Sequence, residues 1–213
     1  MKLYNYYRSS ASYRVRIGLA LKGLNYEYIA VNLVKQGGEQ HSEEHRTRNL
    51  MEQVPVLEIE DHGRTLLLTQ SVSILEYLDE RYPEPAFFPS DPIARAAVRR
   101  CVEIINSGIQ PLQNLKALEE IRKLGGDEKA FARGANERGL AALEAEAEKS
   151  SGSFLVGDKL TLADIFLVPQ MYSARRLNVD VAPFPNLVRI DQAVLAMPAL
   201  AAAHPERQPD ANA

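Results

Sequence analysis

The sequence contains a single cysteine, Cys101, and no apolar run long enough to cross a membrane. One cysteine excludes an internal disulfide, and Cys101 lies within an apolar helical pattern, so we expect a buried core residue in a reducing compartment. A membrane-spanning helix needs roughly 18 or more apolar residues, and the first residues also lack the apolar core of a signal peptide. We therefore expect a cytoplasmic protein that does not contact membranes.

An excess of charge of one sign is also lacking, because the net charge is −3 over 213 residues. This near balance gives no overall attraction to nucleic acid, so we expect no nucleic-acid partner. The sequence has no phosphate-binding glycine loop, Cys-x-x-Cys pair or nucleophile elbow. His41, Glu44 and His45 match the H-x-x-E-H pattern of inverted zinc proteases, but their segment is polar and has no evident third ligand, so we expect no metal site.

Three prolines divide the sequence into two parts with different periodicity. Pro83, Pro85 and Pro89 interrupt regular structure, so residues 83–90 are predicted to be a linker. Residues 1–82 show the order β-α-β-α-β-β-α, which predicts a small α/β domain. Residues 91–213 show only helical periodicity and predict an all-helical domain.

The individual elements follow from periodicity and from helix and turn signals. Predicted strands cover residues 3–7, 26–31, 55–60 and 64–69, and residues 61–63 form a hairpin turn. Ser71 is the predicted N-cap of a helix, and Thr161 and Asp164 form a predicted capping box. The predicted helices cover residues 10–21, 71–82, 92–124 with a bend at Pro111, 127–149, 161–177 and 187–203, followed by a mobile tail over residues 204–213. Residues 42–50 are polar with few apolar anchors and are predicted to form no more than a short, loosely packed helix.

A block of serines and arginines follows the first predicted strand. Ser9, Ser10 and Ser12 stand where a strand ends and a helix begins. The first-turn N–H groups of a helix lack intrahelical acceptors and carry the positive end of the helix dipole, so they bind a thiolate, carboxylate or phosphate. Simple capping of the helix is the alternative interpretation of the same serines.

The stretch from Ser9 to Leu19 resembles the zeta class of the cytosolic glutathione transferases, whose signature has two serines, a cysteine, a serine, an aromatic residue and Arg-Val-Arg. The sequence departs from this signature at Ala11, where the family usually has cysteine, which removes any covalent role for a protein thiol there. Further matches occur in the expected order from residue 2 to residue 210, so the resemblance covers essentially the whole chain. They are Gln53 to Pro55, Gln70-Ser71, Gln110 to Leu115, Val156 to Asp158 and Arg207 to Asp210.

The resemblance implies a fold, an activity and an assembly. The fold is a thioredoxin-like N-terminal domain followed by an all-α domain, and the assembly is a homodimer. The activity is a glutathione-dependent cis–trans isomerisation of maleylacetoacetate to fumarylacetoacetate in tyrosine and phenylalanine breakdown. In the implied mechanism the thiolate adds to the conjugated double bond, the resulting single bond rotates, and elimination returns the thiol. The alternatives are a maleylpyruvate isomerase, a transferase or dehalogenase of small α-halo acids, and a binding module without chemistry.

The resemblance also implies residues that hold glutathione. Ser10 is the predicted donor to the glutathione sulfur, with Ser9 as the alternative, because a donor and a helix dipole lower the thiol pKa. A cis proline at Pro55 leaves the Val54 backbone to pair with the tripeptide. The other predicted contacts are Gln70 and Ser71 for the γ-glutamyl carboxylate, together with Ala11, Ser12, Tyr13, Arg14, Gln40, Gln110, Asn114, Leu115 and Lys116.

Arginines are the predicted clamps for a dianionic substrate, because guanidinium binds carboxylate in a bidentate fork and stays charged. Arg8, Arg14 and Arg176 are the candidates, and Arg8 is favoured because it adjoins the serines. Arg16 and Arg175 are predicted to lie at the surface or at an interface.

Overall fold

The computed structural model describes residues 1–211, except for the side chain of Gln36, and divides the chain into two units. The first unit contains Met1–Pro85 and the residues from Pro198 onward, and the second contains Ala86–Met197. Each unit has its own buried apolar core. Residues 212 and 213 of the predicted tail lie outside the described residues.

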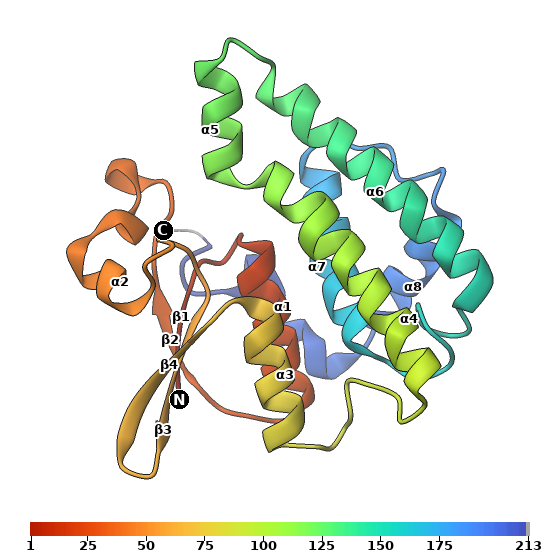
Figure 1. Cartoon of the computed structure of the whole chain (residues 1–213), viewed down its shortest axis with the longest axis horizontal. Coiled ribbons are helices and arrows are strands. Elements are labelled where there is room, and N and C mark those ends of the chain that lie inside the picture. The colour runs from red at the N-terminus through yellow and green to blue at the C-terminus, as the bar shows by residue number, and fades with distance from the viewer. Residues whose placement is uncertain (212–213) are drawn as a thin grey trace. The chain divides into compact units, whose positions relative to one another are not determined.

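The first unit contains a four-stranded mixed sheet in the order β2-β1-β3-β4. β1 (Lys2–Asn5) pairs in parallel with β2 (Glu27–Ala30) and antiparallel with β3 (Val56–Asp61), and β3 pairs antiparallel with β4 (Arg64–Thr69). The helices are α1 (Ser10–Leu21), α2 (Glu43–Arg48) and α3 (Ser71–Arg81), with short 3-10 helices at Lys35–Gly37 and Glu39–His41. Figure 1 shows α1 and α3 side by side. The predicted order and the thioredoxin-like fold are confirmed.

Alternation along the strands gives the sheet two apolar faces. Leu3 of β1 pairs with Leu57 of β3, and both are fully buried. The next pair, Tyr4 with Val56, faces the other side, where it belongs to a cluster with Tyr6, Val31 and Val54. The sheet can therefore support helices or loops on either face, and it fixes the strand ends from which the site residues emerge.

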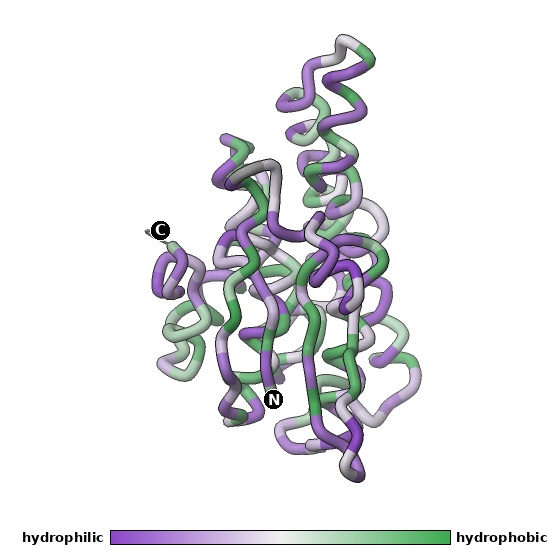
Figure 2. The backbone as a smooth tube through the Cα atoms, turned by 90° about the vertical axis from the view of Figure 1, so that its left-hand side faces the viewer, coloured by the Kyte–Doolittle hydropathy of each residue, from purple (hydrophilic) through white to green (hydrophobic). Residues whose placement is uncertain are grey.

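A tight turn joins β3 to β4, as predicted. His62 and Gly63 have φ angles of 49° and 74°, the positive values that a two-residue hairpin turn of type I′ requires. Figure 2 shows hydrophilic residues at this hairpin tip. The turn leaves β4 at the edge of the sheet.

The second unit is helical, as predicted. Its helices are α4 (Pro92–Glu103), a π-helical stretch (Ile104–Ile109), a 3-10 helix (Gln110–Gln113), α5 (Leu115–Lys123), α6 (Glu128–Ser150), α7 (Leu162–Arg176) and α8 (Pro185–Leu195). The predicted capping box is present at the start of α7, where Thr161 N donates to Asp164 Oδ2 over 2.8 Å. Within residues 1–211, no helix combines the length and apolar character of a membrane span.

The single predicted helix over residues 92–124 is wrong, because α4 and α5, with the π-helical stretch and the 3-10 helix between them, occupy that range. Pro111 has no N–H to donate and its ring excludes the carbonyl of residue 107, so a regular helix cannot pass through this position. A new helix begins after Asn114, whose φ and ψ of −72° and 145° are those of an extended N-cap.

The C-terminal segment differs from the prediction in two ways. The last helix is predicted to extend to residue 203, but α8 ends at Leu195, and Pro198–Ala203 forms a 3-10 helix. Residues from 198 onward belong to the first unit, whereas the predicted division placed them in the helical domain. The predicted mobile tail is wrong for residues 204–211, because buried polar groups hold them: Gln208 Nε2 donates to the carbonyls of Ala202 and His204 over 2.7 and 2.8 Å. A short 3-10 helix, Pro205–Arg207, completes this segment.

Candidate functional site

The N-terminus of α1 carries the two predicted serines in different roles. Ser9 is the N-cap, and its Oγ accepts a hydrogen bond from Ser12 N over 3.2 Å. Ser10 is the first helical residue and is half-buried, and none of the hydrogen bonds among residues 1–211 uses its hydroxyl. Ser9 Oγ is therefore engaged in capping, while the Ser10 hydroxyl remains available to a ligand at the positive end of the helix dipole.

Other residues of the serine block serve the fold. Ser12 is buried, and its Oγ accepts from Tyr6 N over 3.4 Å, while Tyr13 is 1% exposed. The side chains of Ser12 and Tyr13 are therefore packed within the fold, and their contact with the cofactor stays a prediction. Ala11 is half-buried in the first turn of α1.

Both arginines that follow in α1 are buried, which corrects two predictions. Arg14 was a candidate clamp for the substrate, but it is 1% exposed, and its Nη1 donates to Ser71 Oγ over 3.2 Å. Arg14 thus connects α1 to the start of α3. Arg16, predicted at the surface or an interface, is also 1% exposed. Its guanidinium donates to backbone carbonyls, because a buried charge requires partners for its N–H groups.

The start of α3 forms a second helix terminus in the same unit. Gln70, not Ser71 as predicted, occupies the N-cap position, with φ 67° and ψ 120°. Such a backbone costs a non-glycine residue about 1–3 kcal/mol, so the surrounding structure must hold it. Ser71 is the first helical residue and is 5% exposed. Its hydroxyl, the first-turn N–H groups and the Arg14 guanidinium together make this terminus favourable for a carboxylate.

The segment before β3 contains the cis peptide bond Val54-Pro55, as the resemblance implied. None of the hydrogen bonds among residues 1–211 uses the Val54 backbone. The preceding carbonyl, that of Gln53, accepts from His45 Nε2 over 3.0 Å and from Asn49 Nδ2 over 2.9 Å. Both donors are buried, at 2% and 6% exposure, so the region of α2 fixes the peptide beside Val54. Neither His45 nor Asn49 is among the predicted contacts of glutathione.

Gln40 is buried, with an unusual environment for its amide. Its Nε2 donates to Leu33 O over 3.4 Å, whereas its Oε1 is buried without a hydrogen-bond partner. A Cβ atom at Gly38 would collide with this amide, so glycine at that position gives the Gln40 side chain its room. A buried amide oxygen without a donor is costly, and a ligand N–H would satisfy it.

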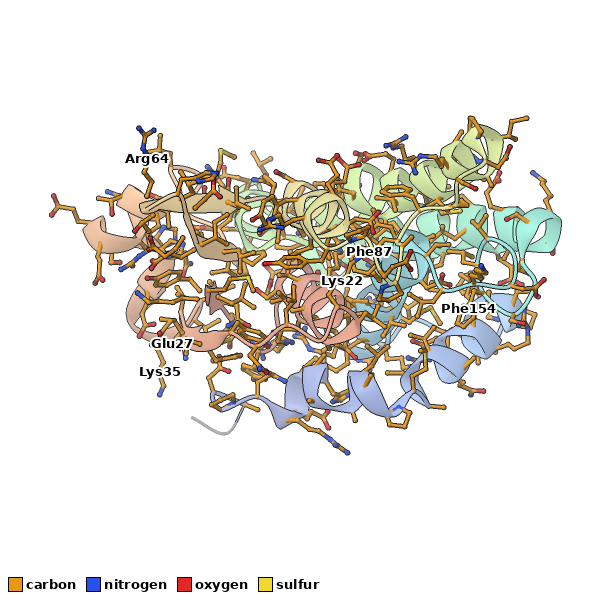
Figure 3. All side chains as sticks on the ribbon, turned by 90° about the horizontal axis from the view of Figure 1, so that it is seen from below. Lys22, Glu27, Lys35, Arg64, Phe87 and Phe154 are labelled. Carbon is orange, nitrogen blue, oxygen red and sulfur yellow. The ribbon has the colours of Figure 1, made fainter. Side chains whose placement is uncertain are left out.

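Arg8 lies in the turn between β1 and α1, next to the serines, and is half-buried. Its guanidinium lies 5.8 Å from the ring centroids of Tyr6 and of Tyr7, and within residues 1–211 it forms no ion pair. Other cations of the first unit are placed differently. Lys35 and Arg64 project away from the ribbon (Figure 3), and Lys22 Nζ donates to Asp79 Oδ1 over 2.9 Å.

The remaining predicted residues belong to the second unit. Arg176 is exposed at the end of α7, 6.0 Å from the Tyr172 ring centroid. Cys101 is buried as predicted, and burial raises the pKa of its thiol to about 11. Across residues 1–211, no group of three or more His, Cys, Asp and Glu side chains is arranged to hold a metal ion. Gln110 lies in the 3-10 helix, and Asn114, Leu115 and Lys116 form the start of α5, so their contacts with the cofactor stay predictions.

A buried amide network supports the segment that contains Gln110 and Asn114. Asn136 Nδ2 donates to Gln113 Oε1 over 2.8 Å, and Gln170 Nε2 donates to Asn136 Oδ1 over 2.6 Å. Asn136 and Gln170 are fully buried, and sequence reasoning missed both. The available signal was the occurrence of an amide on the apolar face of each predicted helix.

Two family models match the chain. They are the N-terminal domain of glutathione S-transferase over residues 1–80 and the C-terminal domain of glutathione S-transferase over residues 115–198. The chain therefore belongs to the glutathione S-transferase family.

Within that family the chain falls in the zeta class, with the maleylacetoacetate isomerases. The enzyme of this name from Rattus norvegicus is 46% identical over 211 residues, which are 99% of this chain and 95% of the rat protein. The Anaeromyxobacter dehalogenans maleylacetoacetate isomerase, solved with dicarboxyethyl glutathione and citrate in its active site, is 52% identical with a TM-score of 0.90, over 100% of this chain and 97% of that chain. A zeta-class maleyl pyruvate isomerase is 40% identical with a TM-score of 0.92, over 99% of both chains.

The anchors of the Gln53 carbonyl lead to a first prediction. Asn49→Ala removes one of the two donors, and a lost buried hydrogen bond costs about 1 kcal/mol, or about fivefold in an equilibrium constant. We expect the dissociation constant for glutathione to rise by up to about this factor, measured by titration calorimetry. Thr47→Ala is the control, because Thr47 is exposed and donates only to Glu44 O within α2. Unchanged affinity in Asn49→Ala, with reduced stability to urea, would assign Asn49 to the fold alone.

Proposed function

We propose that the protein is a glutathione-dependent isomerase that converts maleylacetoacetate to fumarylacetoacetate, and that Ser10 acts on the glutathione sulfur. The observation that carries this proposal is the full-length match to maleylacetoacetate isomerases in a chain whose Ser10 hydroxyl stands uncommitted at a helix N-terminus. A binding module without chemistry would not need this arrangement. The corresponding pathway, tyrosine and phenylalanine breakdown, and a cytoplasmic location belong to the same proposal, and the unpaired, buried thiol of Cys101 supports a reducing compartment.

The residues of the first unit fit glutathione chemically. The unsatisfied Gln40 Oε1 can accept from a ligand N–H, and the Val54 backbone can pair with a peptide, since no hydrogen bond within residues 1–211 uses it. The α3 terminus, with Ser71 and Arg14, suits a carboxylate. We assign these residues to the tripeptide, together with Gln70 at the N-cap of α3.

Bound glutathione supplies a thiol nucleophile that can add to a conjugated double bond and leave again after rotation. The chain's contribution is to stabilise the thiolate: the Ser10 O–H donates toward the sulfur, and the α1 dipole favours negative charge there. Ser10 is a donor and not a base. Ala11 adds no thiol, so the thiol of this reaction comes from glutathione alone.

The proposed substrate is a small keto-diacid. Arg8 carries a guanidinium beside the serines without an ion pair in the described part of the chain, which suits it to one carboxylate of the substrate. Arg176 is the proposed cation for the other carboxylate. The dicarboxyethyl glutathione and citrate in the Anaeromyxobacter dehalogenans isomerase support acidic substrates for this class.

Isomerisation of maleylpyruvate is the second candidate function, because a maleyl pyruvate isomerase matches over 99% of both chains. Residues that act on the thiol cannot distinguish the two substrates, since both react at the same kind of conjugated cis double bond. A transferase or dehalogenase of α-halo acids is the remaining alternative.

Turnover with catalytic glutathione tests the function. Purified protein, supplied with maleylacetoacetate in large excess over glutathione, should give many turnovers per glutathione because elimination returns the thiol. Absorbance follows product formation, and mass spectrometry shows whether a conjugate accumulates. Faster turnover of maleylpyruvate in a parallel assay would favour the second candidate, and stoichiometric loss of glutathione would make the protein a transferase.

The two serines should differ in their effect on catalysis. Ser10→Ala removes a donor to the thiolate and should lower kcat/KM by a factor on the order of ten to a thousand. Ser9→Ala should cost far less activity and mainly reduce stability, since loss of an N-cap costs about 1 kcal/mol. A thiolate absorbance titration should show a higher pKa for bound glutathione in Ser10→Ala. Wild-type turnover in both variants would remove the serines from the mechanism.

We also propose a homodimer. The first unit exposes two pairs of large apolar side chains that are neighbours in the sequence. They are Leu50 (91% exposed) with Met51 (62%), and Leu66 (40%) with Leu67 (39%). The second pair lies on the edge strand β4. Exposed apolar side chains at a sheet edge are typical of an interface, and a second copy of the chain is the proposed occupant.

Light scattering should therefore give about twice the 23.7 kDa chain mass at micromolar concentration. Met51→Glu places a charge in the proposed interface and should shift the protein to the monomer. Leu124→Glu is the control, because Leu124 is 83% exposed but lies in the second unit, in the turn before α6. A monomeric wild-type protein would contradict the proposal.

A further inference from the structure

The tail motif Arg207 to Asp210 matched the family but received no role from the proposed function. In the structure, Asp210 is buried at 7% exposure in the first unit, far in sequence from the residues that it contacts. Its Oδ2 accepts from the backbone N–H of Tyr7 over 3.1 Å, across 203 residues of sequence. Its Oδ1 accepts a short hydrogen bond from the Tyr28 hydroxyl. Burial and this hydrogen bond raise the pKa of Tyr28, so the hydroxyl stays a donor.

Arg16 reaches the same backbone from within α1. Its Nη2 donates to Tyr7 O over 2.8 Å and its Nη1 to Tyr6 O over 3.3 Å. Its Nε donates to Ala203 O over 3.0 Å, so one guanidinium joins the C-terminal segment to the turn after β1. We call Asp210, Arg16 and Tyr28 the C-terminal clasp.

The clasp holds both backbone polar groups of Tyr7, immediately before Arg8 and the serines. Tyr7 N donates to Asp210 and Tyr7 O accepts from Arg16. The turn is further closed by Ser9 N, which donates to Tyr6 O over 3.1 Å. Because the backbone is held on both sides, the direction in which the chain enters α1 is fixed, and with it the position of Ser10.

We propose that Asp210 and Arg16 are positioning residues for the isomerisation, which place Ser10 and Arg8 through the backbone of Tyr7. This inference rests on the proposed function. Asp210 and Arg16 form their hydrogen bonds with the protein's own backbone, with the Tyr28 hydroxyl and with Asn5 Oδ1, so the clasp acts through the turn between β1 and α1 and not on the substrate. A displacement of about 1 Å at a reacting group can cost up to about a hundredfold in rate, so a loosened turn should impair chemistry more than binding.

Asp210→Ala tests the clasp directly. The amide of Tyr7 should exchange with deuterium faster, the pKa of bound glutathione thiol should rise, and kcat should fall about tenfold. The dissociation constant for glutathione should stay within about twofold, because Gln40, Val54 and Ser71, the proposed tripeptide contacts, are not part of the clasp. This split between kcat and binding would not arise from a general loss of stability.

Two controls separate positioning from destabilisation. Glu206→Ala removes an exposed carboxylate from the same segment and should leave all four readouts unchanged. Lys22→Met removes the ion pair with Asp79 and the hydrogen bond to Pro85 O, so it destabilises the first unit without touching the clasp. It should lower the urea midpoint while preserving the thiol pKa.

Conservative variants cover the case in which Asp210→Ala does not fold. Tyr28→Phe and Asp210→Asn preserve shape and should give the same changes at smaller size. Wild-type kcat and thiol pKa in folded Asp210 variants, together with an active wild-type protein, would overturn the positioning role. An inactive wild-type protein would instead overturn the proposed function, and the exchange rate of the Tyr7 amide would still report whether the clasp holds the turn.

Discussion

The first unit depends on the burial of two guanidinium groups in α1. Arg14 and Arg16 are each 1% exposed, and a buried guanidinium is tolerated only where acceptors surround it. Arg16 draws the carbonyls of Tyr6, Tyr7 and Ala203 around one charge, and Arg14 connects α1 to Ser71. The two guanidinium groups therefore fix the positions of the turn between β1 and α1, the C-terminal segment and the start of α3 relative to one another. The cost of burying them is offset by the hydrogen bonds that their N–H groups donate.

In the first unit, the polar groups whose hydrogen bonds maintain the fold are different from those that stay available to a ligand. Ser9 caps α1 while Ser10 keeps its hydroxyl, and His45 and Asn49 hold the Gln53 carbonyl while the adjacent Val54 backbone stays uncommitted among the described residues. In each case the residue directly before a proposed ligand contact has a polar group that is used by the fold: Ser9 before Ser10, and Gln53 before Val54. Such adjacency fixes the position of the contact without using its polar groups, which is the condition for a preorganised site.

Local features were predictable from the sequence, and long-range ones were not. The strands, the hairpin turn and the capping box at Thr161 and Asp164 depend on residues a few positions apart, and they were predicted correctly. The role of Arg16 depends on Ala203, 187 positions away, and that of Asp210 on Tyr7. Sequence periodicity carries no information about such distant pairs, so the sequence wrongly predicts Arg16 at the surface or at an interface and a mobile tail. The N-cap at α3 was misplaced by one residue because serine is the better cap, whereas the structure places Gln70 there with a positive φ.

Because residue 11 is alanine, the exact position of the Ser10 hydroxyl matters more for the proposed chemistry. Where the family usually has cysteine, this chain has a half-buried methyl group that can neither donate a proton nor carry charge. In the proposed mechanism, stabilisation of the thiolate then falls to the Ser10 hydroxyl and the α1 terminus. Both act over short distances: a hydrogen bond weakens steeply once its angle departs from linearity, and the dipole effect fades within the first turn. The position of Ser10 follows from the path of the chain between β1 and α1. The contacts of Asp210 and Arg16 with Tyr7 govern that path, so the last residues of the chain have a direct physical connection to the chemistry proposed at its beginning.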